Sequence, residues 1–384
     1  MRLRKIVALL LCASMITAML AGCSKKTDDA GDTQSQQTSS QKKEAESDTG
    51  DNADTPKTYK IALLLSGNLG DMSFLDSANK GVQEIASTYN AEVKVIEMGS
   101  DSTKYETNVL DASDADYDII IGSGWQLQEP FQNIAQDYPD KKYIIFDASV
   151  DYTLGDYSNV YSITYKANEG SFLAGVMAAS MSKTGIIGFL GGMDGAGIND
   201  FLIGYIEGAK YINPDIKVLS GYVGSYVDSP KCKEMALAQY NQGADFVFTA
   251  AGASGIGTLE AAKETGKFAI GVDSDQAMLY KDTDIEQANL IPASVLKNVD
   301  KTLVRAYKKI LDGTLPWGSA ENLGLVEDAV GLSNNEFYQK LVPDDVKAKI
   351  VEVTEKIVSG EIKVTSAFGL TTDEVTEIIE SVAP

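Results

Sequence analysis

Histidine is absent from the 384 residues of the chain. Catalysis by Ser-His-Asp or Cys-His groups needs an imidazole as the general base, and imidazole is also a common protein ligand of zinc and iron. The absence therefore excludes these two classes of hydrolase and every metal site that depends on histidine. We expect no catalytic residues, no metal and no cofactor.

Cysteine and positive charge are also scarce. The chain has three cysteines, Cys12, Cys23 and Cys232, and the first two lie in or beside an apolar N-terminal segment. If Cys12 is removed with that segment and Cys23 is modified, Cys232 has no partner for an intramolecular disulfide. The chain has 33 Lys and Arg against 55 Asp and Glu, a net charge of −22. This acidity argues against nucleic acid or an anionic lipid surface as a partner.

The N-terminus has the layout of a secretory signal. Basic residues precede a mostly apolar stretch over 6–20, which is shorter than the about 20 residues of a membrane-spanning helix. The stretch ends in "LAGC", which resembles the bacterial lipoprotein processing motif. We therefore predict a signal peptide over 1–22 and acylation of Cys23, for instance by palmitate, on the extracytoplasmic face of the cell membrane. The alternative is a chance cysteine in an ordinary signal peptide.

The segment after this motif is polar throughout. Residues 24–57 contain no aromatic side chain and no aliphatic side chain larger than alanine. Such a segment cannot bury enough surface to offset the entropy lost on ordering. We therefore predict that 23–57 is a flexible tether between the lipid and the folded part of the chain.

From Tyr59 onward, short apolar runs alternate with amphipathic stretches, which predicts parallel strands joined by helices. The first series begins at "YKIALLLS" and ends at "KKYIIFDAS", and a second begins at "SNVYSITYK" and ends at "KFAIGVDSD". The fold class is thus α/β, with two doubly wound lobes and a hinge. The expected lobes are 58–160 plus 275–320 and 161–274 plus 321–384.

Ligands of such sheets bind beyond the carboxyl ends of the strands. Polar and small residues fall there on both expected sheets, which predicts one shared cleft. They include Ser66, Ser123, Asp147, Gly252 and Asp273. The glycine-rich stretches "GFLGGMDGAGIND" and "GASGIGTLEAA" lack both the dinucleotide spacing and a lysine, so we expect no nucleotide phosphate site.

Further residues near these strand ends can be read in two ways. Phe74 is either a core residue of the first helix or an aromatic platform in the cleft, and Trp125 either covers the site or packs within its lobe. Asp71 is a candidate ligand contact that can also cap the helix after it. Asp275 and Gln276 are expected to cap the turn after the strand that ends at Asp273.

Several blocks, in the same order, resemble the basic membrane lipoprotein family, whose members include substrate-binding lipoproteins similar to the purine nucleoside receptor. They are "DMSF", "EGSFLAGVMAA", "GFLGGMD", "YVGSYVD", "QGADFVFTAAGASGIGTLEAAKE", "AIGVDSDQ", "ASVLKNVD" and "SGEIKV". The resemblance covers essentially all of 59–384. It implies a type I periplasmic-binding-protein fold and a non-enzymatic receptor that delivers a nucleoside, in the family's pattern a purine nucleoside, to the permease and ATPase of an ABC importer.

The resemblance also implies roles for individual residues. Asp273 accepts hydrogen bonds from ribose hydroxyls and Lys297 donates to the same sugar. Phe74 and Phe248 sandwich the base, Asp147 and Ser123 bind its edge, and the backbone of Gly252 reaches the sugar.

The chain departs from the family pattern at two positions. Leu75 stands where members often have Asn, and Ser66 or Asn68 replaces an Asp at the end of the first strand. Both departures concern recognition of the sugar. Two other functions stay open: a receptor for another sugar or signalling molecule on the same fold, and a nucleoside or glycoside hydrolase. A hydrolase needs clustered carboxylates for metal binding or for acid and base catalysis, and the sequence offers a single acid pair.

Overall fold

The computed structural model describes residues 57–384. The predicted signal peptide, Cys23 and all but the last residue of the predicted tether lie outside the described residues. Among the helices of 57–384, none is both long and apolar enough to cross a bilayer.

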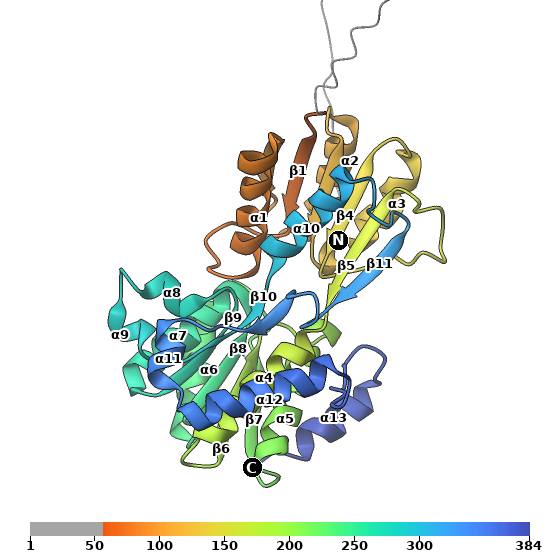
Figure 1. The fold of residues 1–384 in the computed structure, drawn as a ribbon. Coiled ribbons are helices and arrows are strands. Elements are labelled where there is room, and N and C mark those ends of the chain that lie inside the picture. The colour runs from red at the N-terminus through yellow and green to blue at the C-terminus, as the bar shows by residue number, and fades with distance from the viewer. Residues whose placement is uncertain (1–56) are drawn as a thin grey trace, which may run out of the picture. The chain divides into compact units, whose positions relative to one another are not determined.

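The first lobe is built on a six-stranded parallel sheet with the order β11-β5-β4-β3-β1-β2. Its strands are β1 (Lys60–Leu65), β2 (Glu92–Glu97), β3 (Ile119–Ser123), β4 (Lys142–Phe146), β5 (Val160–Tyr165) and β11 (Ser319–Leu323). Its helices are α1 (Phe74–Tyr89), α2 (Tyr105–Asp114), α3 (Gln128–Ile134) and α10 (Val299–Leu311). Figure 1 shows α1 and α10 side by side on this lobe.

The apolar runs of this sheet are continuous because both of its faces are covered. In β1, Ile61 and Leu63 pack with α1 and α10, whereas the alternate residues Ala62 and Leu64 pack with α2 and α3. Side chains alternate between the faces of a strand, so a strand buried on both faces needs an unbroken apolar sequence. This arrangement confirms the pattern that predicted a doubly wound sheet.

The second lobe repeats this plan with the strand order β12-β10-β9-β8-β6-β7. Its strands are β6 (Ile186–Gly191), β7 (Lys217–Tyr222), β8 (Phe246–Ala250), β9 (Phe268–Asp273), β10 (Ser294–Lys297) and β12 (Val330–Leu332). Its helices are α4 (Ala167–Met181), α5 (Ala196–Ile212), α6 (Ser229–Asn241), α7 (Ile256–Thr265), α8 (Gln276–Tyr280), α9 (Ile285–Ala288), α11 (Glu336–Leu341), α12 (Asp344–Val358) and α13 (Thr372–Glu380). All neighbours are parallel except β12, which is antiparallel to β10.

Helices α4 and α5 approach each other closely because glycines lie at their contact. A Cβ on Gly208 would lie 2.0 Å from the carbonyl oxygen of Phe172, and a Cβ on Gly175 would lie 2.2 Å from that of Tyr205. Any larger residue would force the helices apart. This pair shields one face of the second sheet, and α6 and α7 contribute to the core on the other.

The chain passes between the lobes three times, after β5, after β10 and after β11. All three expected lobe boundaries are corrected by the sheet pairing, the last because β11 pairs with β5 and keeps residues 321–323 in the first lobe. Residues 275–297 belong to the second lobe, because β10 pairs with β9. β5 belongs wholly to the first lobe, because it pairs with β4 and β11.

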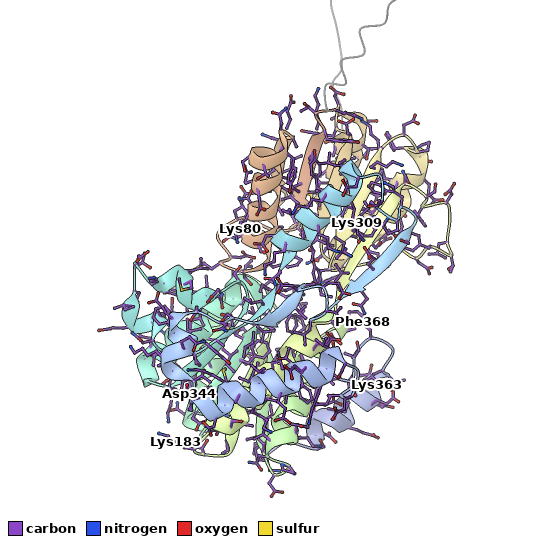
Figure 2. All side chains as sticks on the ribbon, in the orientation of Figure 1. Lys80, Lys183, Lys309, Asp344, Lys363 and Phe368 are labelled. Atoms are coloured by element: carbon purple, nitrogen blue, oxygen red, sulfur yellow. The ribbon has the colours of Figure 1, made fainter. Side chains whose placement is uncertain are left out.

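Ion pairs fix α10 within the first lobe after the second crossing. The Lys80 ammonium of α1 lies 2.7 Å from the Asp300 carboxylate of α10. Lys309, on the last turn of α10, lies 3.1 Å from Glu321 on β11. Figure 2 labels both lysines on this lobe.

Candidate ligand-binding cleft

A cavity of about 380 Å³ lies between the two lobes. The volume is within the range of about 300–1,000 Å³ typical of small-molecule sites. Both sheets direct the carboxyl ends of their strands into it, as the sequence predicted. Eight of the ten candidate residues line the cavity: Ser66, Asp71, Phe74, Trp125, Asp147, Gly252, Asp273 and Lys297. The remaining two, Ser123 and Phe248, do not.

Asp273 ends β9 and is a buried carboxylate of the cavity wall. Its side-chain Oδ2 accepts a hydrogen bond of 2.5 Å from the Ser73 hydroxyl of the other lobe. Burial raises the pKa of Asp273 to about 6, although the charge of Lys297 and the Ser73 hydrogen bond lower it. The residue also has a left-handed backbone, with φ of 60°, which turns it out of the strand.

Lys297 is the cation of the site. Its ammonium donates to Oδ1 of Asp147 at 2.9 Å, and the side chain is only 6% exposed. The ammonium also lies 4.8 Å from the ring centroid of Phe201 and 5.5 Å from that of Phe74. Burial by itself lowers the pKa of Lys297, but the carboxylates of Asp147 and Asp273 outweigh it and raise the pKa overall. The lysine is therefore charged, as the compensation of buried carboxylates requires.

Asp71 caps α1 in this structure. Its Oδ1 accepts from the backbone N–H groups of Ser73 and Asp76, and its Oδ2 accepts from that of Leu75 at 2.8 Å. Burial raises the pKa of Asp71, and these three backbone bonds oppose the rise. Of the two interpretations offered by the sequence, capping is the one with hydrogen bonds in this structure.

Ser66 and Ser123 join the ends of β1 and β3. The Ser66 N–H donates to the Ser123 Oγ at 2.8 Å, and the Ser66 hydroxyl donates to the Ser123 carbonyl at 3.1 Å. Ser123 is fully buried behind this contact. It is therefore a support for Ser66 and not part of the cavity wall.

The position of Phe248 contradicts the predicted sandwich. Its ring is fully buried in the core of the second lobe, against Phe189, Phe201 and Tyr205. Phe248 belongs to the face of β8 that packs on α4 and α5, and alternation along the strand directs its neighbour Val247 to the other face. The sequence located the strand correctly but could not say which face the ring covers.

The second lobe instead places Phe201 and Tyr226 on the cavity wall. Phe201 lies on α5, and Tyr226 lies in the loop between β7 and α6. A Cβ at Gly192 would lie 2.4 Å from the Tyr226 ring, so the tyrosine needs glycine beneath it. The signal for Tyr226 was present in the block "YVGSYVD", in which an aromatic residue follows a glycine just after a strand.

Trp125 takes one of the two roles that the sequence left open. The Trp125 side chain lines the cavity while its residue is 60% exposed, so it covers the site and does not pack within its lobe.

Asp275 accepts from Asn335 at 2.6 Å, and Gln276 accepts from the Val272 N–H at 3.1 Å. Both bonds stay within the second lobe and support the turn after β9, as predicted. Gln276 also donates to the Met72 carbonyl of the first lobe at 3.2 Å.

Two α/β lobes that close on a cavity at their strand ends have the fold of type I periplasmic solute-binding proteins. A solved solute-binding protein of an ABC transporter from Aeropyrum pernix superposes with a TM-score of 0.75, at 27% identity, over 84% of this chain and 97% of that one. A periplasmic solute-binding protein from Actinobacillus succinogenes, 17% identical, shares the fold with a TM-score of 0.58 over 74% of this chain and its whole length.

The family follows from the sequence matches. Residues 58–367 match the family of PnrA-like ABC transporter substrate-binding proteins, and the chain belongs to it. Basic membrane protein A of Borreliella burgdorferi is 35% identical over 80% of this chain and 88% of its own length. An ABC transporter nucleoside-binding protein of Lactococcus lactis is 32% identical over 80% of this chain and 89% of its own. The protein is thus a substrate-binding component that serves a permease and an ATPase, and not an enzyme.

Proposed function

We propose that the protein binds a nucleoside, with a purine base, in the cleft between its lobes and presents it to an ABC permease. The observation that carries the proposal is a buried carboxylate and a buried ammonium, Asp273 and Lys297, in a cavity that aromatic residues of both lobes also line. A nucleoside has a hydroxyl-bearing pentose for the charged pair and a flat base for the rings. The name of the Lactococcus lactis relative supports the same ligand class.

Asp273 and Lys297 bind the pentose in this proposal. Hydrogen bonds to charged groups contribute about 1.5–3 kcal/mol each, which is enough to make a hydroxyl-bearing ligand outcompete water. Oδ2 of Asp273 already accepts from Ser73, so Oδ1 is the oxygen offered to the ligand. Gly252, at the wall of the second lobe, lets its backbone come close to the sugar.

Phe74 and Tyr226 enclose the base from opposite lobes, in place of the pair first expected. Stacking of a base on an aromatic side chain contributes about 1–3 kcal/mol and tolerates many bases. Asp147 therefore supplies selectivity by accepting from a ring N–H or amino group, assisted by Ser66. Leu75 and Ser66, the two departures from the family pattern, both line the cavity, so both contribute to the choice of ligand.

Closure couples these contacts to transport. Phe74 and Asp147 belong to the first lobe, whereas Tyr226, Asp273 and Lys297 belong to the second, so the full set exists only when the lobes are closed. A ligand that contacts both lobes stabilises the closed form further by its differential affinity. The permease recognises the closed form with the ligand bound.

Isothermal titration calorimetry with inosine, guanosine and adenosine tests the ligand class. We expect saturable binding of at least one nucleoside, and much weaker binding of D-ribose and of the free base hypoxanthine. Binding of a sugar without any nucleoside would replace the proposal by a sugar receptor, and formation of hypoxanthine from inosine would contradict a non-enzymatic role. Mass spectrometry of small molecules that copurify with the protein gives an independent identification.

The lipid anchor is proposed from the "LAGC" sequence at 20–23. We expect the full-length protein to sediment with membranes and to incorporate a fatty-acid label. Cys23→Ser should abolish the label and release the protein, and Cys232→Ser is the matched control. A Cys23→Ser protein that still carries the label would contradict the proposal.

A further inference from the structure

Besides the bond between Lys297 and Asp147, three hydrogen bonds join protein atoms of the two lobes beside the cavity. The Ser73 hydroxyl donates to Asp273 Oδ2 at 2.5 Å, the Ser274 hydroxyl donates to the Ser73 carbonyl at 3.1 Å, and the Gln276 amide donates to the Met72 carbonyl at 3.2 Å. Ser73 and Gln276 are fully buried and Asp273 nearly so. The first lobe contributes 72–73, and the second contributes 273–276.

We propose that Ser73 is a positioning residue for Asp273, and that 72–73 with 273–276 form a latch which closes the lobes before any ligand arrives. The inference goes beyond the nucleoside proposal, since none of the three bonds involves a ligand. It makes the orientation of the carboxylate that faces the cavity depend on closure of the lobes.

The first-lobe side of the latch is held rigidly by its own lobe. Asp71 accepts from the Ser73 N–H, and the Asp76 carboxylate accepts from the N–H groups of Gly70 and Met72. Met72 has a φ of 52°, a left-handed conformation that is unfavourable for a side chain of this size. Two carboxylates therefore hold a strained loop in the conformation that directs the Ser73 hydroxyl across the lobe boundary.

The second-lobe side is equally fixed. The Gln276 Oε1 accepts from the Val272 N–H at 3.1 Å, and the Gln276 N–H donates to the Ser294 Oγ at 3.1 Å. Gly271 leaves room for this side chain, since a Cβ there would lie 2.6 Å from the Gln276 Oε1. Both partners are thus preorganised, which lowers the entropy cost of joining them.

The Ser73 bond also decides which oxygen of Asp273 a ligand can reach. Ser73 occupies Oδ2 and fixes the plane of the carboxylate, which leaves Oδ1 for a ligand hydroxyl. Without the Ser73 bond, Asp273 must be oriented by the ligand itself. The apparent affinity of a protein is reduced by the fraction of molecules in the binding-competent state, so loss of the latch weakens binding even though no ligand contact is removed.

Small-angle X-ray scattering of the purified protein, freed of copurified small molecules by exhaustive dialysis, tests the latch. We expect the unliganded wild type to have the radius of gyration of the closed form, and Ser73→Ala to have a larger one. Gln276→Glu provides a second variant: its carboxylate still accepts from Val272 but cannot donate to Met72. Ser77→Ala is the matched control, because this buried serine of α1 accepts from the Asp300 N–H within the first lobe. It should scatter as the wild type does.

Calorimetry with inosine then measures the coupling. We expect Ser73→Ala and Gln276→Glu to bind about tenfold more weakly, which corresponds to a closed fraction of about one tenth in these variants. Ser77→Ala should bind as the wild type does. If the unliganded wild type has the same large radius of gyration as both latch variants, the latch proposal is wrong. Absence of inosine binding by the wild type would count against the proposed ligand alone, because the scattering comparison needs no ligand.

Discussion

The two lobes place an aspartate at the same position of the same sheet, and the two aspartates differ in almost everything else. The strand orders correspond one to one, so β4 of the first lobe matches β9 of the second. Asp147 follows β4 and Asp273 ends β9, and both have a φ of 60°. The Asp147 side chain is 32% exposed and paired with Lys297, whereas Asp273 is buried against Ser73. Topology supplies the position, and the packing around it decides what the carboxylate can do.

The strands that precede the first two crossings between the lobes, β5 and β10, give a second contrast. β5 ends at Tyr165 and its counterpart β10 ends at Lys297, whose ammonium lies 5.6 Å from the Tyr165 ring. One lobe thus ends this strand with an aromatic ring and the other with a cation. Lys297 lies close enough to both aspartates for each of them to raise its pKa. The second lobe therefore supplies the cation that interacts with the cavity carboxylates of both lobes, Asp147 and Asp273.

The largest expected effect is on stability, where the two phenylalanines of the predicted sandwich should differ. Phe248→Ala removes a fully buried ring from the second-lobe core and should lower the free energy of unfolding by about 3–5 kcal/mol. Phe74→Ala, at the half-buried cavity wall, should cost clearly less. Urea denaturation of both variants measures the difference. Equal losses would mean that the two rings have the same role after all.

The next effect concerns the two aspartates. Asp273→Ala should weaken nucleoside binding by about 10- to 100-fold, since it removes a charge-assisted hydrogen bond to the sugar. Asp147→Ala should weaken binding less, because its more exposed carboxylate also interacts with water and with Lys297. Calorimetry with inosine compares them, and guanosine or adenosine shows whether Asp147 selects the base. A greater loss for Asp147→Ala would reverse the assignment of sugar and base sides.

A comparable or somewhat smaller loss of affinity is expected when the aromatic side chains that line the cavity are replaced. Tyr226→Leu and Phe74→Leu should each weaken binding by about 5- to 100-fold, as loss of base stacking contributes about 1–3 kcal/mol. Tyr240→Leu serves as a control, because Tyr240 is buried in the second-lobe core and does not line the cavity. If Tyr226→Leu binds as the wild type does, the base lies elsewhere in the cleft.

Periodicity in the sequence predicted the strands and the cleft, but it did not predict how individual side chains are oriented. Apolar runs located β1 to β9 but not β10, β11 or β12, and the strand-end rule brought Asp147, Asp273 and Gly252 to one cavity. Periodicity did not reveal that Phe248 faces inward, because a strand with both faces buried is apolar on each. It also missed Tyr226, which lies on a loop with no repeat, and the Ser73 bond, which joins residues 200 positions apart.

The smallest expected effect is the pH dependence of stability that Asp273 contributes. Its pKa is about 6 in the folded protein against 3.8 for an unperturbed carboxyl, so the folded state holds a proton that the unfolded state has already lost between these values. The contribution of the protonated Asp273 carboxyl to stability is complete below pH 3.8 and is lost as the pH rises through 6. Between pH 5 and pH 7 this should lower the free energy of unfolding by about 1 kcal/mol.

Denaturation of wild type and Asp273→Asn at both pH values isolates this contribution. Asp71 and Asp200 also have a raised pKa through burial and add the same trend to both proteins, so the difference between the two proteins is the informative quantity. Ligand affinity should move the other way, because protonation of Asp273 below pH 6 removes the charged acceptor. We therefore expect the free energy of unfolding to rise in acid while the affinity for nucleoside falls. If both quantities change in the same direction, Asp273 does not contact the ligand directly.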